Sequence, residues 1–189
     1  MKKADFVPRT ILHLIFLGIS VALALAATQY ANTFVGPVIP DLILDHVTRV
    51  DTSFFFYQGA VILIGFVLLI VIRVPRYIPF TLASVALFYL IRTLLMVTTH
   101  LPSPHISTGA DLFFSGHTGL PFLLSLIFWK YPVLRYFFLV ASVVAGTTVL
   151  LSHVHYSIDV LAAPFITYSI FVLSKKIFKR EYGFVTSNF

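Results

Sequence analysis

The chain has no cysteine and very little charge. Its 189 residues are only 11% charged and 59% hydrophobic, with a mean hydropathy of +0.97. The lack of cysteine excludes a disulfide framework and a thiolate metal site, and the low charge excludes a water-soluble domain and indicates an integral membrane protein. The excess of 13 Lys and Arg over 7 Asp and Glu would suggest nucleic acid in a soluble protein. Here membrane orientation explains it, so no nucleic-acid partner is expected.

Six apolar stretches are long enough, or nearly so, to cross about 30 Å of hydrocarbon as helices. They predict spans over residues 11–31, 54–72, 79–98, 112–129, 133–151 and 156–174. The fourth stretch is interrupted near its start by Ser115, Gly116 and His117. Because neither repeats nor low-complexity linkers are visible, the sequence predicts one all-α membrane domain covering residues 1–189.

The basic residues predict how the bundle is oriented. Eleven of the 13 precede the first predicted span, follow the last, or lie in the loops after the second and fourth. The positive-inside rule therefore predicts six spans with both termini in the cytoplasm. Histidines and aspartates collect at the other side, which would face the periplasm, the cell exterior or an organelle lumen. The first span also resembles a signal peptide, but its apolar run continues through Ala31, so we expect it to be retained.

His155 and Asp159 are the first candidate catalytic pair. Four residues apart, they would share one face of a helix at the outer start of the sixth span. The carboxylate would then hold one imidazole nitrogen and leave the other to attack or to take a proton. The alternative is an aspartate that stabilises a helix start beside an interfacial histidine.

The second candidate group is Ser115-Gly116-His117, at the start of the fourth span. A helix start offers unpaired N–H groups to a phosphate, and Gly116 would let the backbone approach it closely. His117 would act as a general acid for the leaving group. The alternative is a polar helix cap made by Ser115 or Thr118, with an incidental histidine.

Arg92 lies inside the third span, roughly 9 Å below its outer end. A buried arginine costs about 2.5–3.5 kcal/mol on insertion scales without a partner, and its planar guanidinium suits phosphate. Snorkelling, or an ion pair with Asp111 or Asp159, is the alternative. Asp111 is a further candidate for substrate binding. Residues 39–46 are expected to form a short interfacial helix capped by Asp41.

A metal site competes with these assignments, since most histidines face outward and His153 and His155 are close in sequence. The pattern nevertheless lacks a helical His-x-x-x-His pair with a neighbouring Glu. We therefore expect no metal or other cofactor.

Four sequence blocks taken together resemble the type 2 phosphatidic acid phosphatase superfamily, and most closely its sphingomyelin synthase branch. They are IPDLILDH (39–46), RTLLMVTTHLPSP (92–104), DLFFSGHT (111–118) and HVHYSIDV (153–160). The resemblance implies that His155 attacks phosphorus, that Asp159 orients it, and that His117 handles the proton of the leaving or accepting hydroxyl. It also implies a metal-independent reaction.

The sequence departs from the family pattern in two places. Phosphatases of the superfamily carry a Lys-led block that ends in Arg-Pro, and this block is missing. They also carry Ser-Arg six residues before the second catalytic histidine, whereas position 149 is Val here. Arg92 is therefore the main candidate cation. Gly109-Ala110 replaces the Cys-Gly of eukaryotic synthases, which bears on the choice of acceptor.

The sequence thus predicts transfer of a phospho-head-group from a phospholipid donor to a lipid alcohol acceptor within the bilayer, with release of diacylglycerol. With water as acceptor, the same site would be a lipid phosphatase or phospholipase C. A non-catalytic transporter is the third alternative, disfavoured because the polar residues gather at one face. The head group, acceptor and oligomeric state stay open.

Overall fold

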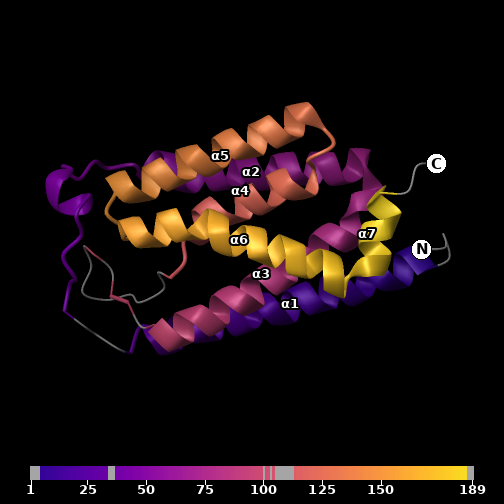
Figure 1. The fold of residues 1–189 in the computed structure, drawn as a ribbon, viewed down its shortest axis with the longest axis horizontal. Helices are drawn as coiled ribbons and strands as arrows, with labels where there is room; N and C mark the ends of the chain where they lie inside the picture. The colour runs from indigo at the N-terminus through magenta and orange to yellow at the C-terminus, as the bar shows by residue number, and fades with distance from the viewer. Residues whose placement is uncertain (1–4, 34–36, 100, 103, 105–112, 187–189) are drawn as a thin grey trace.

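The computed structural model describes residues 5–33, 37–99, 101–102, 104 and 113–186. These residues form seven α-helices and two 3-10 turns and include no β-strand, which confirms the all-α class. The long helices lie side by side in an elongated bundle (Figure 1). The elements are α1 (Phe6–Ala31), η2 (Leu44–His46), α2 (Ser53–Arg73), η3 (Pro75–Tyr77), α3 (Ile78–Thr99), α4 (Gly116–Ile127), α5 (Pro132–Leu151), α6 (Ser157–Ile177) and α7 (Lys179–Thr186).

Four of the helical segments are long and apolar enough to cross a membrane: α1, α3 with the preceding η3 turn, α5 and α6. Large apolar side chains cover the outside of the bundle, and Val133 and Phe165 are each 78% exposed. So many exposed apolar side chains are expected where lipid is the solvent. The fold is therefore compatible with a multi-pass membrane protein, whereas the count of six spans stays a prediction.

Helix α4 is shorter than the fourth predicted span. It begins at Gly116 and has 12 residues, or about 18 Å of helix, whereas residue 112 lies outside the described residues. Helix α4 starts after the N-cap residue Ser115, and it ends at the turn that leads into Pro132, the first residue of α5. The first turn of α4 lies below the end of α5, because Thr118 is next to Gly146, five residues before α5 ends.

Helix α1 packs along α3 through small side chains. Its buried positions in this region are Ser20, Ala24, Ala27 and Ala31, and such residues let two helix backbones approach closely in lipid. The run that resembles a signal peptide therefore forms a helix–helix contact within the bundle.

Helices α3, α4 and α6 meet at Gly119. A Cβ atom there would lie 2.8 Å from the Thr167 hydroxyl oxygen and 2.9 Å from the Phe88 ring. The Phe88 ring also packs at right angles on Phe114, with 5.3 Å between ring centroids. This close packing holds the start of α4 in a fixed position against the other two helices.

Helix α7 folds back onto the start of α1. The buried Glu181 carboxylate forms an ion pair with Arg9 and contacts the His13 ring nitrogen Nε2 at 3.0 Å. The two ends of the described chain therefore lie at one end of the bundle, opposite the segment that carries η2 (Figure 1). An even number of crossings agrees with this placement, and the side of the membrane stays a prediction.

Candidate active site

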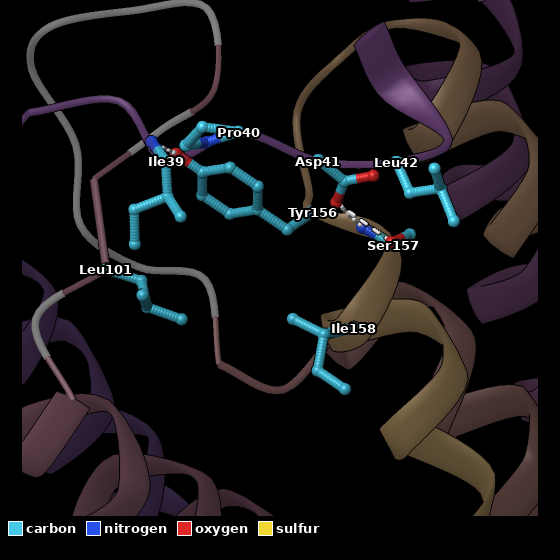
Figure 2. Close-up of a pocket in the computed structure, with 8 residues that line it drawn as sticks. All are labelled: Ile39, Pro40, Asp41, Leu42, Leu101, Tyr156, Ser157 and Ile158. Atoms are coloured by element: carbon cyan, nitrogen blue, oxygen red, sulfur yellow. Dashed lines mark hydrogen bonds between the residues drawn. The ribbon is translucent and has the colours of Figure 1, made fainter. Parts of the chain in front are cut away.

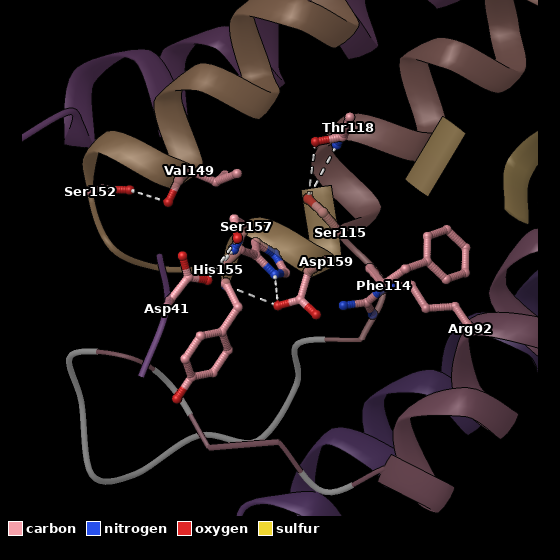
Figure 3. Close-up of polar contacts among 11 residues, drawn as sticks. Asp41, Arg92, Phe114, Ser115, Thr118, Val149, Ser152, His155, Ser157 and Asp159 are labelled. Atoms are coloured by element: carbon pink, nitrogen blue, oxygen red, sulfur yellow. Dashed lines mark hydrogen bonds and ion pairs between the residues drawn. The ribbon is translucent and has the colours of Figure 1, made fainter. Parts of the chain in front are cut away.

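His155 and Asp159 contact each other at the start of α6, as predicted, but His155 lies two residues before the helix begins and so does not share a helix face with Asp159. The ring nitrogen Nδ1 of His155 lies 3.4 Å from Asp159 Oδ2 (Figure 3). Both side chains are buried, at 2% and 0% exposure. The 3.4 Å separation is long for a hydrogen bond. It nevertheless shows that the Nδ1 edge of the ring faces the carboxylate, so that the Nε2 edge faces away from it.

The Asp159 carboxylate also stabilises the helix start. Its Oδ2 accepts a hydrogen bond from the Tyr156 backbone N–H at 3.0 Å, which is half of a capping box. The other oxygen, Oδ1, is buried and accepts no hydrogen bond within the described residues. The Asp159 carboxylate thus makes both the predicted contact to His155 and the helix-start contact of the alternative. The buried acceptor Oδ1 marks a place where a donor would be strongly favoured.

Ser115 caps α4 and ties it to α6. Its hydroxyl oxygen accepts hydrogen bonds from the Thr118 N–H at 3.4 Å and from the Thr118 hydroxyl at 3.2 Å. Its own N–H donates to the Asp159 carbonyl oxygen at 3.1 Å. Because the Ser115 side chain is fully buried, the geometry favours the capping role over direct contact with a substrate.

His117, in the first turn of α4, faces His155. The two ring centroids are 6.1 Å apart, with 64° between the ring planes. The side chain of His117 is exposed, unlike that of His155. The fold thus brings together two histidines that lie 38 positions apart in the sequence, one in the first turn of α4 and one just before α6.

Arg92 reaches from α3 to the same place. Its Nε donates a hydrogen bond to the Phe114 carbonyl oxygen at 3.2 Å (Figure 3). A Cβ atom at Gly116 would lie only 3.1 Å from that Nε. Glycine at position 116 therefore makes room for the guanidinium, a reason that the sequence pattern alone did not indicate.

The histidine pair is recessed in the bundle. Arg92 lies seven residues before α3 ends at Thr99, or about 10 Å along the helix axis. Similarly, Thr118 is in contact with Gly146, five residues before the end of α5. The group therefore lies about one to two helix turns below the helix ends, close to the predicted depth.

Asp41 was expected to cap a short interfacial helix over residues 39–46, but only the three-residue 3-10 turn η2 (Leu44–His46) forms there, with Ile43 at its N-cap position. The Asp41 carboxylate instead stabilises the turn that leads into η2. Its Oδ1 accepts hydrogen bonds from the N–H groups of Ile43 and Leu44, at 2.9 and 3.1 Å. Its second oxygen, Oδ2, accepts from the N–H of Ser157 at 2.7 Å and from the Ser157 hydroxyl at 2.9 Å (Figure 2). Partial burial raises the pKa of Asp41, but these hydrogen bonds outweigh it and hold the pKa below its ordinary value.

The contact between Asp41 and Ser157 was not predicted, because it joins residues 116 positions apart. A second bond supports it, from the Ile39 N–H to the Tyr156 hydroxyl at 3.1 Å. A cavity of about 230 Å³ lies between this segment, Leu101 and the first residues of α6 (Figure 2). The segment 39–42 thus lies directly against the residues that follow His155.

His153 turns the chain between α5 and α6. It adopts a left-handed conformation with φ of 55°, and the N–H groups of His153 and Val154 bond to the carbonyls of Leu150 and Val149. This is a Schellman ending, in which glycine is usual. Its Nε2 lies 3.0 Å from the Val47 carbonyl oxygen, so the ring is engaged with the backbone and not with His155.

One predicted substrate-binding residue, Asp111, lies outside the described residues. Within the part of the chain that the structure describes, no three His, Cys, Asp or Glu side chains are grouped closely enough to hold a metal ion. Metal independence itself stays a prediction.

Two comparisons with known proteins bear on this arrangement. Residues 108–176 match the family model described as PAP2 superfamily C-terminal, while no curated protein matches the chain. The matched segment includes His117, His155 and Asp159 but not Arg92 or Asp41. The match supports the type 2 phosphatidic acid phosphatase superfamily, whose members are phosphatase-type enzymes. The match suggests a lipid phosphatase or phosphotransferase type of function.

Proposed function

We propose that this protein is a membrane lipid phosphotransferase of the sphingomyelin synthase type. It would move a phospho-head-group from a phospholipid to a lipid alcohol and release diacylglycerol. The observation that carries the proposal is the facing pair of imidazoles, His117 and His155, with a buried carboxylate behind one of them.

In the first step, Nε2 of His155 attacks phosphorus, and the bond from phosphorus to the diacylglycerol oxygen breaks. His117 gives its proton to the departing alkoxide. Asp159 stabilises the positive charge that develops on the His155 ring and keeps Nδ1 protonated. The Arg92 guanidinium balances charge on the phosphoryl oxygens, an interaction that strengthens as the transition state forms.

In the second step, the neutral His117 takes a proton from the acceptor hydroxyl, whose oxygen attacks phosphorus. The bond between phosphorus and His155 breaks, and both histidines return to their starting protonation states. The recessed position of the pair, together with the exposed apolar surface around the bundle, favours an acceptor that arrives from within the bilayer.

Hydrolysis at the same residues is the second candidate, and the match to a phosphatidic acid phosphatase family supports it. Water would replace the lipid alcohol in the second step, and the first step would be unchanged. The two reactions differ only in the product that carries the head group.

A product analysis tests both candidates. Purified protein would be incubated with head-group-labelled phosphatidylcholine or phosphatidylethanolamine, with and without ceramide or diacylglycerol, and the labelled products separated. A labelled lipid product formed only with acceptor supports transfer, and a labelled soluble product supports hydrolysis. His155→Ala and His117→Ala should each abolish turnover. The exposed His46, whose ring contacts the Leu42 carbonyl, provides the matched control His46→Ala, which should retain it.

Full turnover in either active-site variant would refute the assignment. A chelator should leave the rate unchanged. Loss of activity that zinc restores would instead favour metal chemistry.

A further inference from the structure

A second cavity lies at the end of the bundle opposite the histidine pair. Its volume is about 390 Å³, and its lining comes from the end of α4, the second half of α6 and α7. Lys175, which lines it, lies 16 residues after Asp159 on α6, or about 24 Å along the helix. The cavity is therefore separate from the candidate active site.

Two lysine ammonium groups from different elements line this cavity. The Lys175 Nζ lies 4.8 Å from the centroid of the Phe171 ring and 5.8 Å from that of Tyr182, so cation–π contacts hold it against the wall. The Lys130 Nζ lies 3.5 Å from the Thr186 carbonyl oxygen. These contacts draw both side chains toward α7, whereas a snorkelling lysine would extend away from the bundle into water.

The charge at the cavity is positive. None of the described lining residues is acidic. The α7 carboxylate, Glu181, contacts Arg9 and His13. A third cation, Arg135, lies over the ring of the lining residue Trp129 at 4.7 Å.

We propose that this cavity binds the phosphate of an anionic membrane phospholipid. Basic pockets between membrane helices bind such head groups, and tryptophan and tyrosine rings lie at head-group depth. Trp129 and Tyr168 line the cavity and are about half exposed, so it opens on the lipid-facing surface. Leu126 and Phe171 supply apolar wall for the first part of an acyl chain.

The chain carries its own reporter for this binding, because Trp129 is its one tryptophan. The protein would be reconstituted in phosphatidylcholine vesicles, and part of the lipid replaced by brominated phosphatidylglycerol or brominated phosphatidylcholine. Each lysine near the surface contributes about a fivefold preference for anionic lipid. Brominated phosphatidylglycerol should therefore quench Trp129 at a mole fraction about five- to twentyfold lower than brominated phosphatidylcholine does.

The double variant Lys130→Gln with Lys175→Gln should lose this preference. The matched control, Lys176→Gln with Lys179→Gln, removes the same charge from two exposed lysines outside the cavity. This control should keep most of the preference for anionic lipid. Changing Lys130 and Lys175 to arginine should also keep it, which separates charge from folding.

Three results would overturn the proposal. The first is equal quenching by the two brominated lipids in the unchanged protein. The second is an equal loss in the control pair, which would indicate general surface charge. The third is removal of the preference by millimolar inorganic phosphate, which would indicate a site for free phosphate. The measurement involves no turnover, so its outcome is independent of the proposed function.

Discussion

Gly116→Ala is the sharpest test of how the site is assembled. The added Cβ would lie 3.1 Å from Arg92 Nε, which is closer than ordinary van der Waals contact. The guanidinium would have to withdraw by a few tenths of an ångström. The hydrogen bond to the Phe114 carbonyl, already 3.2 Å long, would then weaken or break.

The expected effect separates activity from stability. Alanine is favoured over glycine in helices by up to about 1 kcal/mol, so the melting temperature should not fall. A misplacement of 1 Å near reacting groups costs on the order of a hundredfold in rate. A shift of a few tenths of an ångström should therefore lower kcat/KM by about tenfold.

The assay compares initial rates with labelled phospholipid and thermal melting for Gly116→Ala and for Gly65→Ala. Gly65 lies in α2, and a Cβ there would meet nothing within 4 Å, so that variant should retain full activity. Because Gly116 acts through Arg92, the double variant with Arg92→Lys should be no slower than Arg92→Lys alone. Wild-type turnover in Gly116→Ala, or additive losses in the double variant, would refute this reasoning.

Three further substitutions follow from the contacts. Asp159→Asn should lower turnover by about a thousandfold or more, because an amide neither holds the Nδ1–H tautomer of His155 nor stabilises its charge. Its melting temperature should change little, and an unaltered rate would contradict the dyad. Asp41→Asn should reduce the free energy of unfolding by about 1–2 kcal/mol through its bonds to Ser157. In the folded protein the pKa of Asp41 lies below its ordinary value of 3.8. The stabilisation by its carboxylate is therefore complete above pH 3.8 and is lost as the pH falls through the pKa of the folded state. Denaturant titrations at about pH 3 and about pH 6 would detect the loss. Glu181→Gln should reduce the free energy of unfolding by about 2–3 kcal/mol, because it leaves the partly buried Arg9 guanidinium without its carboxylate partner. The turnover rate of the folded variant should stay unchanged, and a lower rate would contradict the separation of this end of the bundle from the active site.

Local features of the site were predicted because they depend on nearby residues. The spacing of His155 and Asp159 predicted a contact between them, and the structure confirms that contact. The predicted shared turn of helix was wrong, because α6 begins only at Ser157. The capping tendency of Ser115 was recognised as an alternative, and Ser115 does cap α4. Periodicity does not give the length of a capped helix inside an apolar run, so the fourth predicted span includes the three described residues 113–115, which precede α4.

The sequence by itself determined the membrane class, the approximate positions of the helices and the residue types available for chemistry. Hydrophobic length and local spacing are sufficient for those conclusions. Only the tertiary structure decided that His117 faces His155, that Arg92 requires a glycine at position 116, and that Asp41 bonds to Ser157. Each of these contacts joins segments far apart in the chain. Their geometry depends on how the helices pack, and a pattern of single residues does not contain that information.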